Sequence, residues 1–249
     1  FAEDLYAAAT HCKDCANKLF KLQDFEAAAD HYTLAIEELR RFRWPAMSSA
    51  CWVLVNHGGT LVAGEVTTAD SQAKTAEVSL QSATSQVVRG VPWRVLIPIH
   101  TAQLQLQSSL YMNRARAFSQ LSHHQEAAQD LSVVLGFWSG NCCGADSGVG
   151  EAERCEQRAK ALFLRSKARL ARLRVGPARA DLKEALSMCP PEAMCKQLRQ
   201  LEREIELAAR EQVRSNKRLA KEIAKFADSA MSQMDEAQLA AMGQGAADE

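Results

Sequence analysis

The sequence predicts a mainly α-helical protein made of stacked antiparallel helix pairs, with a small β-rich insertion and a long C-terminal helix. One spacing of small residues occurs three times along the 249 residues. The stretch between the first and second occurrence is rich in β-branched residues and glycine turns. After residue 190, apolar residues recur every three to four positions, which is the period of a helix face. These observations predict, in order, the helix pairs, the insertion and the terminal helix.

The repeated spacing consists of three small residues separated by twelve and then by seven positions. Two antiparallel helices approach within about 8–10 Å only where small side chains face each other. The spacing therefore predicts three helix pairs, one within residues 1–43 and two within 101–189. The nine marking residues are Ala16, Ala28 and Ala35, then Ala115, Ala127 and Val134, then Ser166, Ala178 and Ala185.

The residues around these marks resemble the tetratricopeptide-repeat (TPR) consensus. The resemblance lies in Lys-Asp-Cys-Ala-Asn-Lys-Leu-Phe at 13–20, Asp-Phe-Glu-Ala-Ala at 24–28, Leu-Tyr-Met-Asn-Arg-Ala at 110–115 and Ala-Arg-Ala-Asp-Leu at 178–182. A TPR is a helix–turn–helix of about 34 residues that stacks on its neighbours. The resemblance implies a three-repeat TPR solenoid whose concave face comes from the first helix of each pair. An ordinary helical bundle is the alternative.

Residues 44–100 are expected to form the insertion between repeats one and two. Short apolar runs at 51–55, 60–66, 76–80, 87–88 and 93–97 are strand candidates, and Asn-His-Gly-Gly at 56–59 is a turn signal. Their order resembles an SH3- or Tudor-like barrel. Trp52 and Trp93 either line a second recognition pocket or belong to the core of the insertion, and the core is favoured because tryptophan is mostly buried. A second insertion, the Gly- and Ser-rich segment 136–150, is expected to be an exposed, mobile loop.

The TPR resemblance also implies a ligand and a set of site residues. Many TPR co-chaperones carry a carboxylate clamp that binds the C-terminal Glu-Glu-Val-Asp tail of heat shock protein 90 or 70 class chaperones. The position of the final clamp arginine holds Leu164, with Arg165 one residue along, and Arg116 is expected on the same surface. The candidate peptide-binding residues are Lys13, Asn17, Asn113, Lys160, Arg116 and Arg165.

The chemistry of a carboxylate ligand suits these residue types. Lysine offers charge-assisted hydrogen bonds to a carboxylate, and asparagine has both a donor and an acceptor with which to hold a peptide end in register. Lys13 and Asn17 are four apart and so project from one helix face. Leu164 in place of a cation is expected to weaken binding of the chaperone tail. The alternative is that these residues are ordinary solvated positions on helix surfaces.

Residues 190–228 are expected to form a basic amphipathic helix that caps the solenoid. Leu198, Leu201 and Ile205 mark its apolar face, and Lys and Arg become frequent from Arg210 onward. This arrangement is similar to the C-terminal region of large immunophilins and aryl-hydrocarbon-receptor-interacting co-chaperones, which implies calmodulin or a client protein as a further partner. Residues 229–249 are expected to be a Met-containing, partly disordered tail.

Composition and charge restrict the remaining functions. The 30 Lys and Arg residues balance 30 Asp and Glu residues, so no global charge favours nucleic acid or a membrane. Eight cysteines in a chain of this length do not form a disulfide framework, which suits the cytoplasm, with the nucleus as an alternative. Because the chain begins with Phe1, a preceding domain is left open.

The sequence contains none of the motifs for phosphate binding, metalloprotease or hydrolase chemistry. We therefore expect a non-enzymatic co-chaperone adaptor without a cofactor. One alternative is a structural adaptor that holds an internal peptide of a larger assembly, with the β insertion as second contact. Another is a metal or thiol protein that uses Cys12, Cys15, Cys142 and Cys143.

Overall fold

The computed structural model describes residues 2–41, 51–81, 86–99, 103–138, 150–188 and 190–245. Side chains are described for residues 6–40, from 51 through 188 within these ranges, and for 190–231. The chain divides into two compact units, Phe1–Glu202 and Arg203–Glu249. The helix pairs, the sheet and both cavities discussed below belong to the first unit.

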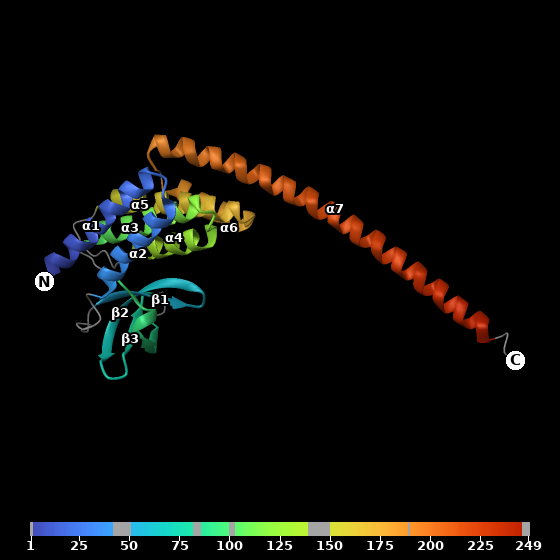
Figure 1. The fold of residues 1–249 in the computed structure, drawn as a ribbon, viewed down its shortest axis with the longest axis horizontal. Coiled ribbons are helices and arrows are strands. Elements are labelled where there is room, and N and C mark those ends of the chain that lie inside the picture. Colours follow the sequence, from blue (N-terminus) through green and yellow to red (C-terminus); the bar gives the residue numbers. More distant parts are fainter. Residues whose placement is uncertain are drawn as a thin grey trace. The chain divides into compact units, whose positions relative to one another are not determined.

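The helices of the first unit follow one another as antiparallel pairs (Figure 1). Each helix packs on the next in chain order, and α2 packs on α3 although the strands separate them in sequence. α1 also contacts α3, and α3 contacts α5, so the first helices of successive pairs are neighbours. The bounds are α1 Ala2–Lys21, α2 Phe25–Arg41, α3 Leu104–Gln120, α4 His124–Trp138, α5 Glu151–Ala171 and α6 Val175–Ser187.

The small residues that predicted the helix pairs lie in the packed contacts between the helices. All nine marking residues are buried, with at most 1% of their surface exposed. In the α5–α6 pair, the hydroxyl of Ser166 donates a hydrogen bond of 2.8 Å to the carbonyl of Ala178. Both ends of that bond are marking residues, so the spacing identifies a point of direct contact between the two helices.

The turns within the helix pairs share one backbone geometry. Gln23, Ser122 and Leu173 all have left-handed backbones, with φ of 64°, 61° and 57°. In each turn, the next residue donates its backbone N–H to the carbonyl five positions earlier. The three bonds are Asp24 to Leu19 at 3.1 Å, His123 to Phe118 at 2.8 Å and Arg174 to Arg169 at 2.9 Å. The turns of the three helix pairs are therefore equivalent in backbone conformation, as the pairs are in sequence spacing.

Replacing Leu173 with glycine is expected to stabilise the first unit. A left-handed backbone costs an L-residue roughly 1–2 kcal/mol, and glycine removes that strain at some entropic cost. Leu173 is 73% exposed, so little packing is lost. Urea denaturation should show a gain of about 0.5–1 kcal/mol. The matched control is Leu22→Gly, at a comparably exposed leucine without positive φ; it should lose stability, and equal losses in both variants would contradict the strain argument.

The insertion is an antiparallel sheet with strand order β4-β3-β2-β1-β5, so the β-rich prediction is confirmed (Figure 1). The strands are β1 Trp52–His57, β2 Thr60–Asp70, β3 Thr75–Leu80, β4 Val87–Pro92 and β5 Ile97–Pro98. The strand predicted at 93–97 is instead a 3₁₀ turn, Trp93–Val95, followed by a two-residue strand. The ring of Pro92 fixes its φ at −61°, and the indole N–H of Trp93 donates to the carbonyl of Thr75 at 2.8 Å.

The sheet shares the hydrophobic core of the helices. Along β1, Val53 and Val55 point into a core within the sheet, whereas Leu54 points into the helical core, as the two-residue period of a strand requires. A Cβ on Gly136 of α4 would lie 2.8 Å from Cδ1 of Leu54, so glycine permits this close approach. Trp52 packs against the helical core, which supports its interpretation as a structural residue.

The loop predicted at 136–150 begins later than expected. Gly136, Phe137 and Trp138 belong to α4 and are buried. The indole N–H of Trp138 donates to the hydroxyl of Ser108 at 2.9 Å. Burial of two large aromatic side chains outweighs the low helix propensity of glycine, which is about 1 kcal/mol per residue. The rest of the predicted loop, residues 139–149, lies outside the described residues.

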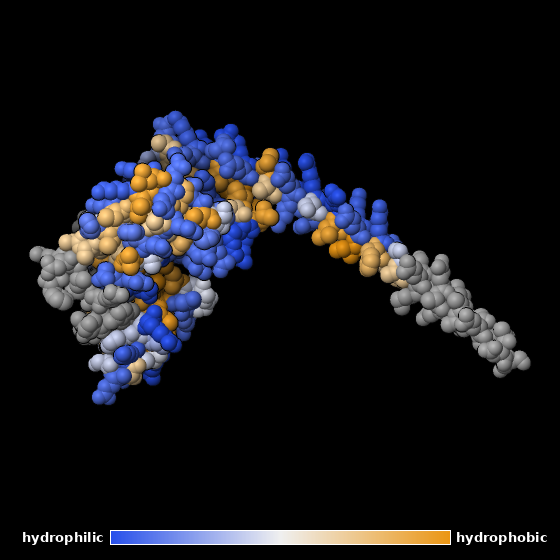
Figure 2. Space-filling view, viewed as in Figure 1, coloured by the Kyte–Doolittle hydropathy of each residue, from blue (hydrophilic) through white to orange (hydrophobic). Residues whose placement is uncertain are grey.

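The C-terminal helix, α7, runs from Glu192 to Gly245 and extends beyond the predicted end at 228. The added segment is rich in Ala, Met and Gln, which are strong helix formers. Leu198 and Leu201, in the first unit, are buried. In the second unit Leu219, Ile223 and Phe226 are exposed, and Figure 2 shows apolar side chains along this helix. A calmodulin or client contact on this face stays a prediction. None of the described helices has the length and apolarity needed to cross a membrane.

Candidate peptide-binding site

A cavity of about 260 Å³ lies where α1, α2 and α3 meet. α1 contributes three of the lining residues at positions 17, 20 and 21, which share one helix face. The prediction from sequence named three of the six lining side chains and missed Phe20, Lys21 and Tyr32. Lys21 follows Asn17 by four residues, which is the signal that would have identified it. The lining consists of Asn17, Phe20, Lys21, Tyr32, Asn113 and Arg116.

Two asparagines, 96 positions apart in the chain, meet in this cavity. Oδ1 of Asn17 accepts a hydrogen bond from the hydroxyl of Tyr32 at 2.7 Å and another from Nδ2 of Asn113 at 3.2 Å. These two donors fix which way the Asn17 amide points. Its Nδ2 has no acceptor among the side chains that the structure describes, so it is available to a ligand that accepts hydrogen bonds.

The hydroxyl of Tyr32 stabilises the orientation of the Asn17 amide by donating a hydrogen bond to it. Burial raises the pKa of this hydroxyl, while the neighbouring Asn113 amide and the positive charge of Arg116 act in the opposite direction. Because the net shift is upward, the phenol stays protonated at neutral pH and keeps donating to Asn17. Tyr32 therefore orients the amide from the second helix of the first pair.

The cavity carries positive charge without a compensating carboxylate. Lys21 and Arg116 both line it, and no Asp or Glu does so in the described part of the chain. Cations and amide donors around a small cavity match a carboxylate ligand, since charge-assisted hydrogen bonds are the stronger kind. The arrangement therefore suits an anionic peptide end.

The structure places the other predicted residues outside this cavity. Lys13 lies on α1, one helical turn before Asn17, and does not line the cavity. Lys160 lies on α5, where its Nζ forms an ion pair of 2.7 Å with Oε1 of Glu156. Of the six predicted site residues, the structure brings together Asn17, Asn113 and Arg116.

Arg165 does not join that group because its guanidinium is engaged elsewhere. Its Nε donates to Oδ2 of Asp181 at 3.0 Å, and a second nitrogen donates to Oδ1 at 2.7 Å. The remaining terminal nitrogen bonds to the hydroxyl of Ser132 at 3.1 Å. Leu164 packs against the helical core, and the next residue points about 100° around the helix from it.

The same three-residue contact occurs one pair earlier in the chain. Arg114 of α3 forms two bonds with Asp130 of α4, at 2.8 and 2.7 Å, and one with the hydroxyl of Thr33 at 3.0 Å. We call each set an arginine brace: Arg114–Asp130–Thr33 and Arg165–Asp181–Ser132. Burial lowers the pKa of Arg114, but the bonds and charge of Asp130 more than offset this and raise it overall. Each brace ties a helix pair to the pair before it.

The thiols and histidines do not form a metal site in the part of the chain that is described, where no group of three or more His, Cys, Asp or Glu is placed to hold a metal. Cys15 contacts His11 on the same helix, with 3.7 Å from Sγ to Nε2. Cys142 and Cys143 lie outside the described residues.

Comparison with known proteins finds no family model and no curated protein that matches the chain. Solved structures do match. The Arabidopsis OM64 TPR domain is 17% identical over 81% of this chain and 97% of that chain, with a TM-score of 0.43. The first TPR of Spaghetti (RPAP3) bound to the HSP90 peptide SRMEEVD is 15% identical over 80% and 94%, with a TM-score of 0.41. The Sgt2 TPR domain from Aspergillus fumigatus is 15% identical over 81% and 82%, with a TM-score of 0.40.

Proposed function

We propose that this protein is a TPR-type adaptor without catalytic activity, which binds the C-terminal carboxylate of an acidic peptide. The binding site is the cavity between α1, α2 and α3 described above, which we call the Asn17 cavity. The observation that carries the proposal is the meeting of two asparagine amides with Lys21 and Arg116 around a space that no described carboxylate lines. The partner class is that of heat shock protein 90 or 70 chaperones, whose tails end in an acidic residue.

The geometry supports separate roles for the lining residues, with the asparagines as hydrogen-bond donors and Lys21 and Arg116 as the source of positive charge. The amide nitrogens of Asn17 and Asn113 donate to the terminal carboxylate, and Tyr32 keeps the Asn17 amide in register. Lys21 and Arg116 supply the opposite charge. To Lys13, one turn before Asn17 on α1, we assign the contact with an acidic side chain further from the peptide end.

Replacing Asn113 with alanine is expected to weaken binding of a peptide ending in Glu-Glu-Val-Asp by at least about tenfold, the scale of one hydrogen bond to a charged group. The change removes one amide donor and one of the two bonds that orient Asn17. Fluorescence anisotropy with a labelled peptide at two salt concentrations measures this loss. Lys18→Ala is the matched control, because Lys18 is an exposed residue of α1 that does not line the cavity.

A peptide with an amidated C-terminus separates the proposal from its main alternative. If the cavity recognises a chain end, amidation should abolish most of the binding. Equal affinity for the free and amidated peptides would instead favour an adaptor that holds an internal segment. Lys13→Ala and Lys160→Ala measure whether these two lysines contribute, and no binding by the unaltered protein would reject the site.

A further inference from the structure

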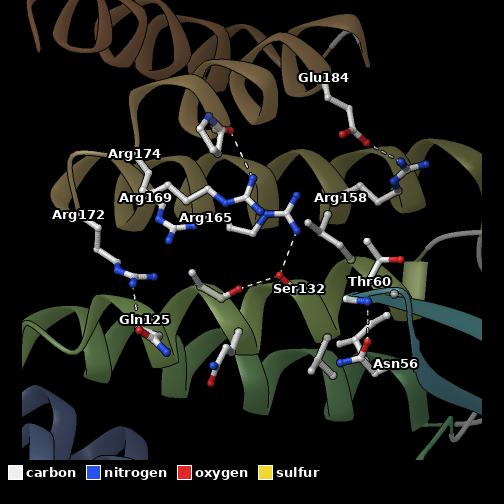
Figure 3. A pocket seen from close by; sticks show the side chains of 18 residues that line it. Asn56, Thr60, Gln125, Ser132, Arg158, Arg165, Arg169, Arg172, Arg174 and Glu184 are labelled. Carbon is white, nitrogen blue, oxygen red and sulfur yellow. Dashed lines mark hydrogen bonds and ion pairs between the residues drawn. The ribbon is translucent and has the colours of Figure 1, made fainter. Parts of the chain in front are cut away.

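A larger cavity, of about 840 Å³, shares no lining residue with the Asn17 cavity. It lies between α4, α5, α6 and the turn that joins β1 to β2 (Figure 3). Its volume falls within the range of about 300–1,000 Å³ typical of ligand pockets. We call it the arginine groove, because five arginines line it: Arg158, Arg165, Arg169, Arg172 and Arg174.

The arginine groove carries more positive charge than its carboxylates balance. Glu184 lines it and forms an ion pair of 2.8 Å with Arg158. Asp181 is buried beside it and serves both Arg165, at 2.7 Å, and Arg169, at 2.8 Å. Two carboxylates therefore face five guanidinium groups, which leaves three positive charges unbalanced within the described residues.

Several hydrogen-bond donors in the groove lack a strong acceptor. A guanidinium nitrogen of Arg172 donates to the neutral side chain of Gln125 at 2.9 Å. Nε of Arg158 is buried and has no hydrogen-bond partner in the described structure. Burial, and next the charge of Arg165, lower the pKa of Arg169, as expected where cations crowd together. An anion in the groove would relieve this crowding.

The chemistry of the lining selects among anionic partners. No aromatic side chain lines the groove in the described structure, so it offers no platform on which unpaired bases stack. Apolar side chains, including Leu61, Val133 and Leu135, lie among the arginines instead. The planar fork of a guanidinium matches a carboxylate in two-bond geometry. A ligand that matches this lining has carboxylates next to aliphatic groups, and an acidic peptide with aliphatic residues has both.

We propose that the arginine groove is a second docking site, which binds an internal acidic peptide segment through side-chain carboxylates. Arg172 and Arg174 bond to the carboxylates, and an aliphatic residue of the peptide packs on Leu61 and Leu135. The β1–β2 turn forms one wall, so the insertion takes part in recognition. The site needs no C-terminal carboxylate and is independent of the Asn17 cavity.

The test uses the full chain and a fluorescein-labelled peptide of Glu and Leu residues with a blocked N-terminus and an amidated C-terminus. Arg174→Glu should lower its affinity at least about tenfold, and Arg172→Glu with Arg174→Glu should lower it further. A peptide with Gln in place of Glu should also bind at least about tenfold more weakly. Circular dichroism and urea denaturation should match the unaltered protein, because neither arginine belongs to a brace.

Arg179→Glu is the matched control, because it changes the charge by the same amount as Arg174→Glu. Arg179 is exposed on α6 and does not line the groove. This variant should alter affinity less than about twofold if the groove is the site, rather than the net charge. Asn113→Ala should leave binding intact, which separates this proposal from the Asn17 cavity. The proposal is overturned if the unaltered protein does not bind the peptide, or if Arg179→Glu is as damaging as Arg174→Glu. Tighter binding of a single-stranded RNA oligonucleotide that is also lost in Arg174→Glu would overturn it too.

Discussion

Replacing Asp130 with alanine is expected to lower the free energy of unfolding by about 3–5 kcal/mol, the cost of breaking a buried ion pair by removing one partner. Asp130 and Arg114 form two bonds at 2.8 and 2.7 Å, and both side chains are largely buried. Without the carboxylate, a guanidinium that also bonds to Thr33 is left buried with its charge uncompensated. Urea denaturation followed by circular dichroism measures the loss.

The chain supplies both a control and an internal replicate for this prediction. Asp30 is an exposed aspartate of α2, and Asp30→Ala should change stability by less than about 0.5 kcal/mol. Asp181→Ala breaks the second brace and should cost as much as Asp130→Ala or more, because Asp181 also pairs with Arg169. A loss below about 1 kcal/mol in both brace variants would show that water replaces the carboxylate without penalty.

The helix positions could be predicted because small residues leave a local trace in the sequence. Where two backbones approach closely, only small side chains fit, so the spacing of the marking residues follows directly from packing. The arginine braces leave a weaker trace: an Arg and an Asp sixteen positions apart in the second and third pairs. A single Arg or Asp in the sequence is one charged residue among many. Only the recurrence of the Arg–Asp pair at equivalent positions of two helix pairs indicates a structural role.

The two cavities differ in how far the sequence reveals them. Asn17 and Asn113 are named as site residues only by the resemblance to TPR co-chaperones, and the structure brings the two side chains together. The same resemblance implies Arg165 beside them, but Arg165 is one residue past the clamp position, and this offset turns its side chain about 100° around the helix, toward Asp181. The arginine groove is lined by the β1–β2 turn and by helices more than sixty residues later in the sequence. Its local excess of positive charge is not visible in the composition, because the net charge of the whole chain is zero.

Replacing Leu54 with alanine is expected to destabilise the whole first unit by about 3–5 kcal/mol, the cost of a large-to-small change in a well-packed core. Leu54 is fully buried between β1 and α4, where Gly136 permits contact. Leu54 joins one face of the sheet to the helical core, while the other face has a core of its own, and we expect this joint packing to make the sheet and the helices unfold together. Urea denaturation followed by tryptophan fluorescence and by far-ultraviolet circular dichroism should give coincident transitions, both shifted to lower urea.

Coincident transitions would distinguish a shared core from a sheet that folds by itself. In the second case Leu54→Ala would shift only the part of the fluorescence that comes from Trp52 and Trp93, and would leave in place the helical circular dichroism and the fluorescence of Trp138 in α4. Thr68→Ala, at an exposed position of β2, should change stability by less than about 1 kcal/mol and serves as control. Leu54 does not line the arginine groove, yet it packs β1 against α4, and α4 and the β1–β2 turn both contribute lining residues to that groove. Leu54→Ala should therefore weaken binding of the acidic peptide even in conditions where the protein stays folded, because the position of the β1–β2 turn relative to α4 depends on the packing beneath them.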